Sequence, residues 1–220
     1  MLNVAFAPSP EDAFPCILPM IGVMGSFDSP SAGLGEAMDC YIHGYVSSRL
    51  MRLADGQAKG IPVCISATKV DGLVLALTPF NHSYNYRSAV LQGYAKPVES
   101  QEEKLWAMEL VTNKVVPGRW SNSRVPPDNA EVQSTQILRV TIESGSGKIR
   151  HGQPHDDAKD VANSDVVNSV WTGVVPVREI FEEARAGPDN KVSETPAYIS
   201  SYISEANTTI REEMEQSLKE

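Results

Sequence analysis

The sequence predicts a mainly β protein of the α+β class. We expect a barrel or strongly curved sheet of about six to eight antiparallel strands, with about three helices outside it. Short apolar runs rich in β-branched and aromatic residues follow one another between turn-forming residues, as in hairpin-linked strands. No Gly-rich dinucleotide motif or P-loop is present in the sequence, which disfavours a parallel doubly wound sheet.

The individual strands are predicted from these apolar runs and from the turns between them. Pro-Ser-Pro-Glu-Asp at 8–12 separates the first two runs and predicts a hairpin, and the Ser-, Gly- and Pro-rich residues 26–35 predict an exposed loop. Val-Asp-Gly at 70–72 predicts a tight hairpin turn. Strands are predicted at 2–7, 14–24, 39–44, 62–69, 72–78, 86–98, 136–144 and 169–177.

Three segments predict helices. The period of the apolar residues becomes helical over 47–58, with Ser47 or Ser48 at the N-terminus. Ser-Gln-Glu-Glu at 100–103 predicts a capping box that opens a second helix. Residues 198–218 place their apolar side chains on one face and predict a terminal helix. Loops are predicted at 118–128, 151–165 and 187–196.

Composition and charge argue against several functions. The 220 residues have a net charge of −9 and no Lys/Arg-rich block, so we expect no binding of nucleic acid. No apolar run approaches the ~20 residues of a membrane span, and the first residues lack the features of a signal peptide. We therefore expect a cytoplasmic protein that does not interact with membranes. A barrel domain is predicted at 1–180, followed by a linker and C-terminal helix at 181–220.

The cysteines favour reduced thiols over disulfides or metal ligands. Cys16, Cys40 and Cys64 leave one thiol unpaired under any disulfide scheme, and each lies in an apolar, strand-like run. Buried reduced thiols in a cytosolic protein are the expected state. The spacing of Cys and His does not suit zinc, so we expect no metal site.

The segment from His43 to Arg49 is the first candidate binding site. A predicted strand ends at His43, and Ser47, Ser48 and Arg49 follow at the start of a predicted helix. Free backbone N–H groups at a helix start bind anions, and the planar fork of Arg suits phosphate. The alternative is an ordinary helix cap followed by an exposed Arg.

Three further clusters could contribute to such a site. Arg87 opens a predicted strand, and Lys148 and Arg150 follow a bend of small residues at 144–147. Trp171 lies in the last predicted strand and could form a wall for an aromatic ring system. The alternatives are a surface charge, a solvated turn and a core side chain, respectively.

Together, six motifs in order resemble one family. They are His-Gly-x-x-Ser-Ser-Arg-Leu, Val-Cys-Ile-Ser-x-x-x-x-Asp-Gly-Leu-Val-Leu-Ala, His-Ser-x-Asn-Tyr-Arg-Ser, Pro-Gly-Arg-Trp, Ser-Gly-Lys-Ile-Arg and Trp-Thr-Gly-Val-Val-Pro, at 43–50, 63–76, 82–88, 117–120, 146–150 and 171–176. Over roughly residues 2–178 the chain resembles the pyridoxamine 5′-phosphate oxidase-related flavin-nucleotide-binding proteins, including the nitroimidazole-resistance (Nim-type) branch. The resemblance implies an antiparallel split β-barrel homodimer with FMN in the cleft between protomers.

The resemblance also implies roles for residues of the first half of the chain. Ser48 and Arg49, next to Ser47 at the helix start, match the segment that holds the FMN phosphate. Met20 and Ile21 match a strand whose backbone groups line the isoalloxazine ring. His43 matches a histidine near the flavin, and it is the best candidate for a general acid or base because its ordinary pKa is close to neutrality.

Residues later in the chain are expected to complete the site. Arg87 matches the start of the strand that flanks the phosphate pocket. Trp171 and Gly173 match a Trp-x-Gly segment near the flavin that comes from the partner chain. From its charge alone, Lys148, like Arg150, is a candidate to stabilise a reduced, anionic flavin.

The expected function is therefore that of an FMN-dependent oxidoreductase acting on a small organic substrate. Leu50 stands where the oxidases proper have Lys, and Val174-Val-Pro176 replaces their Arg-x-His substrate signature. Oxidation of pyridoxamine phosphate is consequently not expected. The alternatives are a non-catalytic module for flavin, or for haem through His43 or His82, and a structural protein that docks through its C-terminal helix.

Overall fold

The computed structural model describes residues 1–9, 11–33 and 35–217, which form two compact units. Unit 1 consists of Met1–Ala67 and Ala89–Ser146, and unit 2 of Thr68–Ser88 and Gly147–Glu220. Three long strands, β5 (Ile61–Leu75), β6 (Ser83–Pro97) and β7 (Thr135–Arg150), contribute residues to both units. The domain boundary expected at residue 180 stays a prediction.

The predicted mainly β class is confirmed. The eight described strands form one sheet in the order β2-β1-β5-β6-β7-β4-β3, with β8 paired to β5. Every strand pair with an assigned register is antiparallel, for example Leu2 with Met20 and Gly72 with Pro176. The other strands are β1 (Leu2–Phe6), β2 (Cys16–Met20), β3 (Gly22–Gly25), β4 (Asp39–Tyr45) and β8 (Gly173–Pro176).

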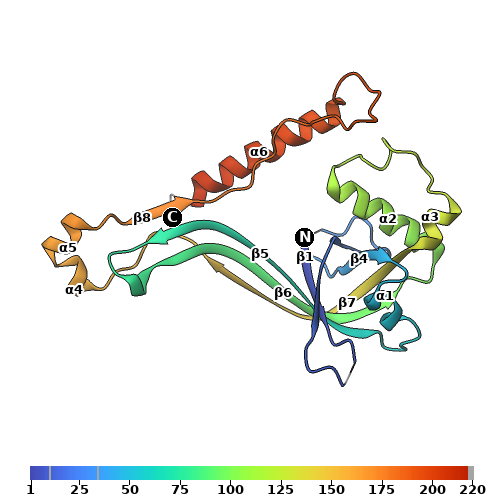
Figure 1. Cartoon of the computed structure of the whole chain (residues 1–220), viewed down its shortest axis with the longest axis horizontal. Helices are drawn as coiled ribbons and strands as arrows, with labels where there is room; N and C mark the ends of the chain where they lie inside the picture. The colour runs from blue at the N-terminus through green and yellow to red at the C-terminus, as the bar shows by residue number, and fades with distance from the viewer. Residues whose placement is uncertain (10, 34, 218–220) are drawn as a thin grey trace. The chain divides into compact units, whose positions relative to one another are not determined.

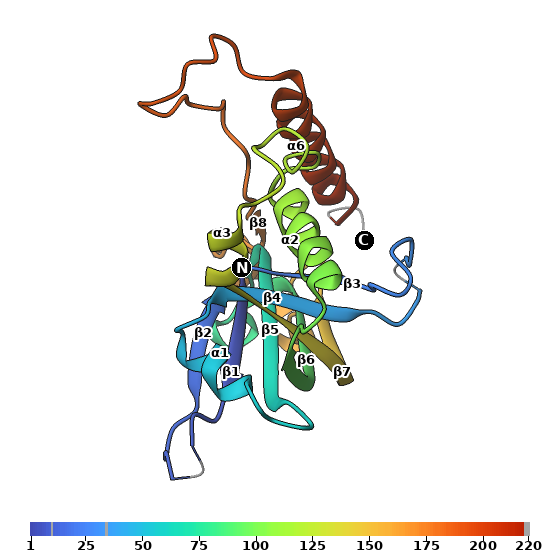
Figure 2. The same ribbon diagram turned by 90° about the vertical axis from the view of Figure 1, so that its right-hand side faces the viewer.

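Unit 1 contains the hydrophobic core. Alternate residues of its strands point inward, so that Val4, Ile42 and Leu138 are fully buried. Helix α1 (Arg49–Ala54) covers part of this core with Leu50 and Met51. Full burial of such a side chain contributes about 1.5–3 kcal/mol to stability, so the curved strands of Figure 2 are held together mainly by this core.

Helix α2 (Gln101–Val115) packs beside β4, as both ribbon views show (Figures 1 and 2). The rings of Trp106 and Tyr41 meet edge to face with their centroids 5.1 Å apart. Ser100 caps the helix by accepting from the Glu103 N–H, as predicted. The Glu103 carboxylate, however, accepts from Tyr41 Oη at 2.8 Å and from Arg139 at 3.0 Å. This carboxylate therefore links the helix to the sheet instead of serving as the predicted second half of the capping box.

Unit 2 is built around the ends of β5 and β6, joined through the short 3-10 helix η1 (Pro79–Asn81). Strand β8 pairs with β5, and α4 (Ala158–Val161) contacts α5 (Ser164–Ser169) in Figure 1. Helix α6 (Ala197–Ser217) is the terminal helix that the sequence predicts. Its residue Tyr202 packs edge to face on Phe181.

The predicted hairpin turn at 70–72 is wrong. These residues stay extended within β5, because Gly72 pairs with Pro176 of β8 and an added Cβ at Gly72 would lie only 2.9 Å from Val174. The turn instead follows Leu75, where His82 Nδ1 accepts from the Ala76 N–H at 2.9 Å. A neighbouring strand about 100 residues later in the sequence thus overrides the local turn signal.

Several other boundaries also differ from the predictions. The run at 14–24 forms two strands that are separated at Ile21, and the small residues at 144–147 continue β7 instead of forming a bend. Helix α3 (Asn129–Ser134), which opens on a capping box formed by Asp128 and Glu131, was not predicted. Helices α4 and α5 replace parts of the loop at 151–165 and of the strand at 169–177, and α1 is shorter than the helix expected at 47–58.

Three predicted features include residues outside the described ranges. They are the turn at 8–12, the loop at 26–35 and the end of the terminal helix at 218. Within the described ranges, none of the helices combines the length and the apolar character needed to cross a bilayer.

Candidate functional site

Strands β2, β3 and β4 bring Ile21 and His43 together in unit 1. Ile21 lies between the end of β2 and the start of β3, where Gly22 pairs with Ile42 of β4. The half-buried His43 forms a hydrogen bond with the backbone of Ile21. Burial lowers the pKa of His43 from its ordinary value, and the Ile21 hydrogen bond opposes this shift in part. His43 is therefore neutral near pH 7.

Two buried polar atoms in this region have no hydrogen-bond partner among the described residues: His43 Nδ1 and Ser48 Oγ. Ser48 occupies the N-cap position of α1, yet its hydroxyl makes no capping hydrogen bond. An unsatisfied buried polar group costs about 1–3 kcal/mol, so atoms of this kind call for a partner. A bound polar ligand would provide one.

Gly44 allows the surrounding side chains to approach. A Cβ added there would lie 2.8 Å from Met51 Cε, 3.7 Å from Met20 Cε and 3.8 Å from Ser48 Oγ. Met20 and Ser48 therefore lie together on the Gly44 face of β4, and Ile21 and His43 are joined by their hydrogen bond. Because successive side chains of a strand point to opposite faces, the His43 ring lies on the other face of β4. The strand predicted to end at His43 instead continues through Gly44 to Tyr45.

The neighbouring Ser47 and Arg49 are exposed. Arg49 forms an ion pair with Asp12, with Nη2 and Oδ2 separated by 3.0 Å and with 53% and 43% of the two side chains exposed. A pair this accessible contributes at most about 1 kcal/mol. Asp12, which the sequence analysis did not single out, could therefore be replaced by a more highly charged anion such as a phosphate.

Arg87 lies in unit 2 and is already paired with two carboxylates. It donates to Asp71 from Nε at 3.0 Å and from Nη2 at 3.1 Å, and Nη2 also reaches Glu213 at 3.2 Å. The hydrogen bonding that Arg87 donates to Asp71 is the main cause of the raised pKa of Arg87. A phosphate at Arg87 would have to compete with both acidic side chains.

Lys148 and Trp171 also lie in unit 2. Lys148 Nζ is 5.6 Å from the centroid of the Tyr86 ring, in a cation–π arrangement. The Trp171 side chain is 65% exposed, and its ring lies against Gly173, where an added Cβ would be 2.9 Å from the indole. Gly173 also has a φ of +151°, so two independent reasons require glycine there. The Trp-x-Gly motif thus places an exposed aromatic ring directly against a glycine.

The predicted site residues fall into two groups. Unit 1 contains Met20, Ile21, His43, Ser47, Ser48 and Arg49, and unit 2 contains Arg87, Lys148 and Trp171. That all nine contribute to one site stays a prediction.

His82, the second candidate for binding haem iron, has a structural role. Its Nδ1 accepts a hydrogen bond from the backbone of Ala76, so the neutral imidazole holds its proton on Nε2. Neither nitrogen then offers a free lone pair to a metal. His43, with an unpartnered Nδ1, has no such restriction within the described residues.

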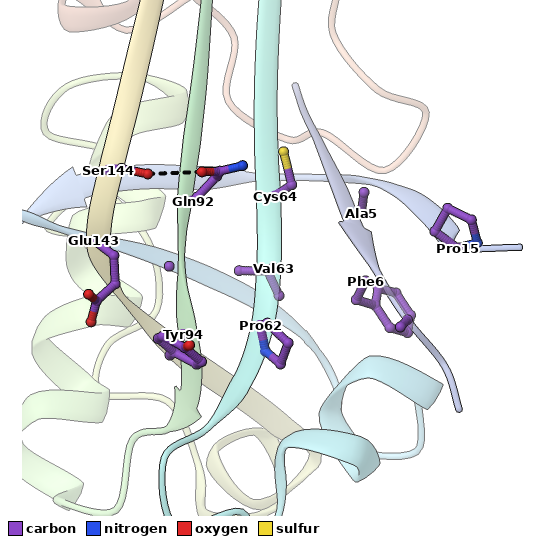
Figure 3. A pocket seen from close by; sticks show the side chains of 12 residues that line it. Ala5, Phe6, Pro15, Pro62, Val63, Cys64, Gln92, Tyr94, Glu143 and Ser144 are labelled. Carbon is purple, nitrogen blue, oxygen red and sulfur yellow. Dashed lines mark hydrogen bonds between the residues drawn. The ribbon is translucent and has the colours of Figure 1, made fainter. Parts of the chain in front are cut away.

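Unit 1 also contains at least two cavities. One, of about 480 Å³, lies along β1, β5, β6 and β7 and includes Cys64, Tyr94 and Glu143 together with a 2.9 Å hydrogen bond between Ser144 and Gln92 (Figure 3). The other, of about 520 Å³, lies among residues of β3 to β6 and the loop before β4. None of the predicted site residues lines either of these two cavities.

Comparisons with known proteins address the family and the fold. The family model for pyridoxamine 5′-phosphate oxidase matches residues 1–149. The flavocytochrome Anf3 from Azotobacter vinelandii is 24% identical, with a TM-score of 0.72 over 91% of this chain and 83% of its own. The FAD and heme binding protein from Mycobacterium smegmatis is 26% identical, with a TM-score of 0.73 over 92% of this chain and 88% of its own. No curated protein matches the chain.

These findings confirm the predicted split β-barrel fold. The family match ends at residue 149, earlier than the expected limit near 178. The structural matches cover more than nine tenths of the chain, so they extend into the residues after 149.

Proposed function

Because this chain belongs to the pyridoxamine 5′-phosphate oxidase family, we propose that it binds a flavin nucleotide and acts as a flavin-dependent oxidoreductase. One observation supports the location of the site. Two buried polar atoms, His43 Nδ1 and Ser48 Oγ, lack partners in the described part of the chain, and His43 forms a hydrogen bond with the backbone of Ile21. A flavin nucleotide has ring and phosphate groups that could satisfy both.

We assign the phosphate and the ring of the flavin to different residues according to the chemistry of each residue. Ser48 and Arg49, beside Ser47, hold the phosphate by hydrogen bonding and charge. The backbone of Met20 and Ile21 lines the ring. These contacts suit FMN, which we expect from the family, and they equally suit the FMN portion of FAD, which the Mycobacterium smegmatis relative binds.

When bound, a flavin supplies electron transfer, and the protein supplies position and electrostatics. His43 is neutral and half-buried, so its Nδ1 can accept a proton or a hydrogen bond beside the ring. Leu50 and Val174-Val-Pro176 replace groups expected for pyridoxamine phosphate, so the substrate is another small organic molecule. The three cysteines are free thiols, which is compatible with work in the cytoplasm.

We further propose a homodimer in which Trp171 of one protomer contributes to the flavin site of its partner. Exposed apolar side chains of unit 2, including Ile149 and Trp171, favour a covered state of this kind. Arg87 and Lys148 are further candidates to contribute to the flavin site of the partner. Arg87 would first have to break its ion pairs with Asp71 and Glu213.

The phosphate assignment is tested with Arg49→Ala. If Arg49 holds the phosphate, the dissociation constant for FMN or FAD should rise at least about tenfold, since charge-assisted hydrogen bonds contribute about 1.5–3 kcal/mol. Arg52→Ala, one turn along α1 and also exposed, is the matched control and should retain wild-type affinity. Equal affinities for wild type and Arg49→Ala, measured by fluorescence titration, would refute the assignment.

The shared site is tested by mixing two variants. Arg49→Ala and Trp171→Ala should each lose flavin affinity alone, but subunit exchange between them should restore wild-type affinity at about a quarter of the sites. Each mixed dimer has one intact site, because the two substitutions meet in the other. No recovery on mixing, with exchange verified by mass spectrometry, would show that Trp171 does not act in trans.

A second candidate function is haem binding through His43. The Mycobacterium smegmatis relative binds haem as well as FAD, and His43 has the neutral, unpartnered nitrogen that an iron ligand requires. An intense Soret band in the purified protein that disappears in His43→Gln would support it. Flavin bands alone, unchanged by haem addition, would exclude it.

A further inference from the structure

The second cavity of unit 1 extends from the surface into the barrel. Its volume is about 520 Å³, within the range of about 300–1,000 Å³ typical of small-molecule sites. Cys40 and Ile65 are nearly or fully buried at its floor, whereas Gly33, Ala89 and Lys114 are exposed at its rim. Its described lining is Leu2, Gly22, Val23, Met24, Ala32, Gly33, Met38, Cys40, Ile65, Ala67, Ala89, Leu91 and Lys114.

The space exists because small residues face it. Alanine occupies positions such as Ala32, Ala67 and Ala89, where larger side chains would fill a normally packed interior. The remaining walls are mainly aliphatic or thioether side chains, such as Leu2 and Met24, which offer little to hydrogen-bond water. An apolar molecule would therefore gain more from entering this cavity than water does.

Lys114, in the last turn of α2, is the one charged side chain among the described lining residues. Burial and the neighbouring Asp39 raise the pKa of the Cys40 thiol to about 12, so the floor of the cavity is uncharged. At the rim, the Glu36 carboxylate already accepts from the Gly33 N–H at 2.7 Å. The cavity thus combines an apolar interior with a single cation at its entrance.

We propose that this cavity binds a small, apolar organic molecule with one anionic group, the body against Val23 and Ile65 and the anion beside Lys114. None of the residues assigned to the flavin lines this cavity, and its lining begins at Gly22, next to Ile21 in the sequence. The cavity would bind a second ligand, in addition to the proposed flavin. This second ligand is an aromatic or aliphatic carboxylate or sulfonate.

The test compares 2-naphthoate with its neutral analogue 2-naphthamide. Dissociation constants are measured by isothermal titration calorimetry on the full chain as purified, with its flavin content recorded. We expect naphthoate to bind more tightly by about two- to fivefold, because an ion pair with the exposed Lys114 is worth about 0.4–1 kcal/mol. Lys114→Met should abolish this preference and leave naphthamide binding unchanged.

The second part of the test uses substitutions that fill the cavity with a larger side chain. Ala89→Phe should weaken binding of both probes by at least about tenfold, and Ala67→Phe should do the same if the first variant does not fold. Ala5→Phe, which fills the other cavity of unit 1, is the matched control and should leave both constants unchanged. Arg49→Ala should also leave them unchanged, so that failure here is distinguishable from failure of the flavin proposal.

Three results would overturn the proposal. They are no naphthoate binding at millimolar concentration, binding that Ala89→Phe and Ala67→Phe leave unchanged, and a preference for naphthoate that persists in Lys114→Met.

Discussion

The two units of this chain are stabilised in different ways. Unit 1 has a continuous core of fully buried side chains such as Ile42 and Leu138. In the described part of unit 2, Val74 and Ala76 are the only hydrophobic residues that reach this degree of burial, whereas Ile149 and many other large apolar side chains are exposed. Unit 1 therefore has a closed, packed core, whereas unit 2 leaves much of its apolar surface exposed.

In unit 2, hydrogen bonds and ion pairs connect segments that lack a large hydrophobic core. The buried Asn85 donates to the backbone oxygen of Gly152 at 3.0 Å and accepts from Arg150. Arg87 joins Asp71 of β5 to Glu213 of α6. Contacts of this kind fix geometry but contribute less stability than a core of the same size. The two units should therefore respond very differently to mutation.

The largest expected effect separates the two units directly. Leu138→Ala in unit 1 should lower the free energy of unfolding by about 2–5 kcal/mol, because it leaves a cavity in a closed core. Ile149→Ala in unit 2, where the side chain is 68% exposed, should cost less than about 0.5 kcal/mol in the monomer. Urea denaturation at low protein concentration measures both. Equal losses would show that unit 2 is packed as tightly as unit 1.

A somewhat smaller effect is expected where α2 joins the sheet. Glu103→Ala should lower the free energy of unfolding by about 2–3 kcal/mol, because the buried hydroxyl of Tyr41 and the Arg139 guanidinium lose their acceptor. This expected loss of unfolding free energy takes into account that Arg139 is partly exposed. Glu102→Ala changes the adjacent, exposed residue and is the control. A loss no greater than in this control would show that the buried carboxylate is not what anchors the helix.

Within unit 2, loss of a buried hydrogen-bond partner should lower the free energy of unfolding by a smaller amount and affect only nearby residues. Asn85→Ala removes the partner of Gly152 and Arg150 and should cost about 1–2 kcal/mol. Hydrogen exchange measured by mass spectrometry should then speed up in peptides of unit 2 and not in those of unit 1. Asn168→Ala, an exposed asparagine in α5, is the control. Faster exchange throughout unit 1 would contradict the separation of the two units.

The smallest expected effect is a pH dependence from His43. Its pKa is lower in the folded than in the unfolded chain, so the unfolded chain binds more protons between the two values. The stability contribution is present above about pH 6.5 and is lost as the pH falls through the folded-state pKa. Melting temperatures between pH 8 and pH 5 should fall less for His43→Gln than for wild type. His155→Gln, at an exposed histidine, should retain the wild-type profile, and identical profiles for all three proteins would contradict the prediction.

The sequence was informative where local chemistry decides the structure. Ser100 opens α2, and the apolar face of 198–218 forms α6 over its described length, because caps and helical periods depend on nearby residues. The turn predicted at 70–72 failed because a strand distant in the sequence pairs with Gly72. Only the fold could reveal that pairing.

The candidate site shows the same division. The motif that contains His43 and Ser48 includes Gly44, whose Cβ position lies near Ser48 and Met20. The carboxylates that pair with Arg49 and Arg87 could not be predicted, because Asp12 and Glu213 are distant in the sequence from the arginines they meet. The cavity beside Lys114 was also missed, since it depends on small residues from several strands.

Flavin retention tests the central claim most directly, namely that the region around Ile21, His43 and Ser48 holds a flavin nucleotide. The full chain is incubated with excess FMN or FAD, passed through a desalting column and examined by absorption spectroscopy. We predict that wild type retains near-stoichiometric flavin and that Ser48→Val, which replaces the unpartnered hydroxyl by a methyl group, retains much less. Wild-type protein that keeps neither nucleotide, or Ser48→Val that keeps as much as wild type, would contradict the proposed site.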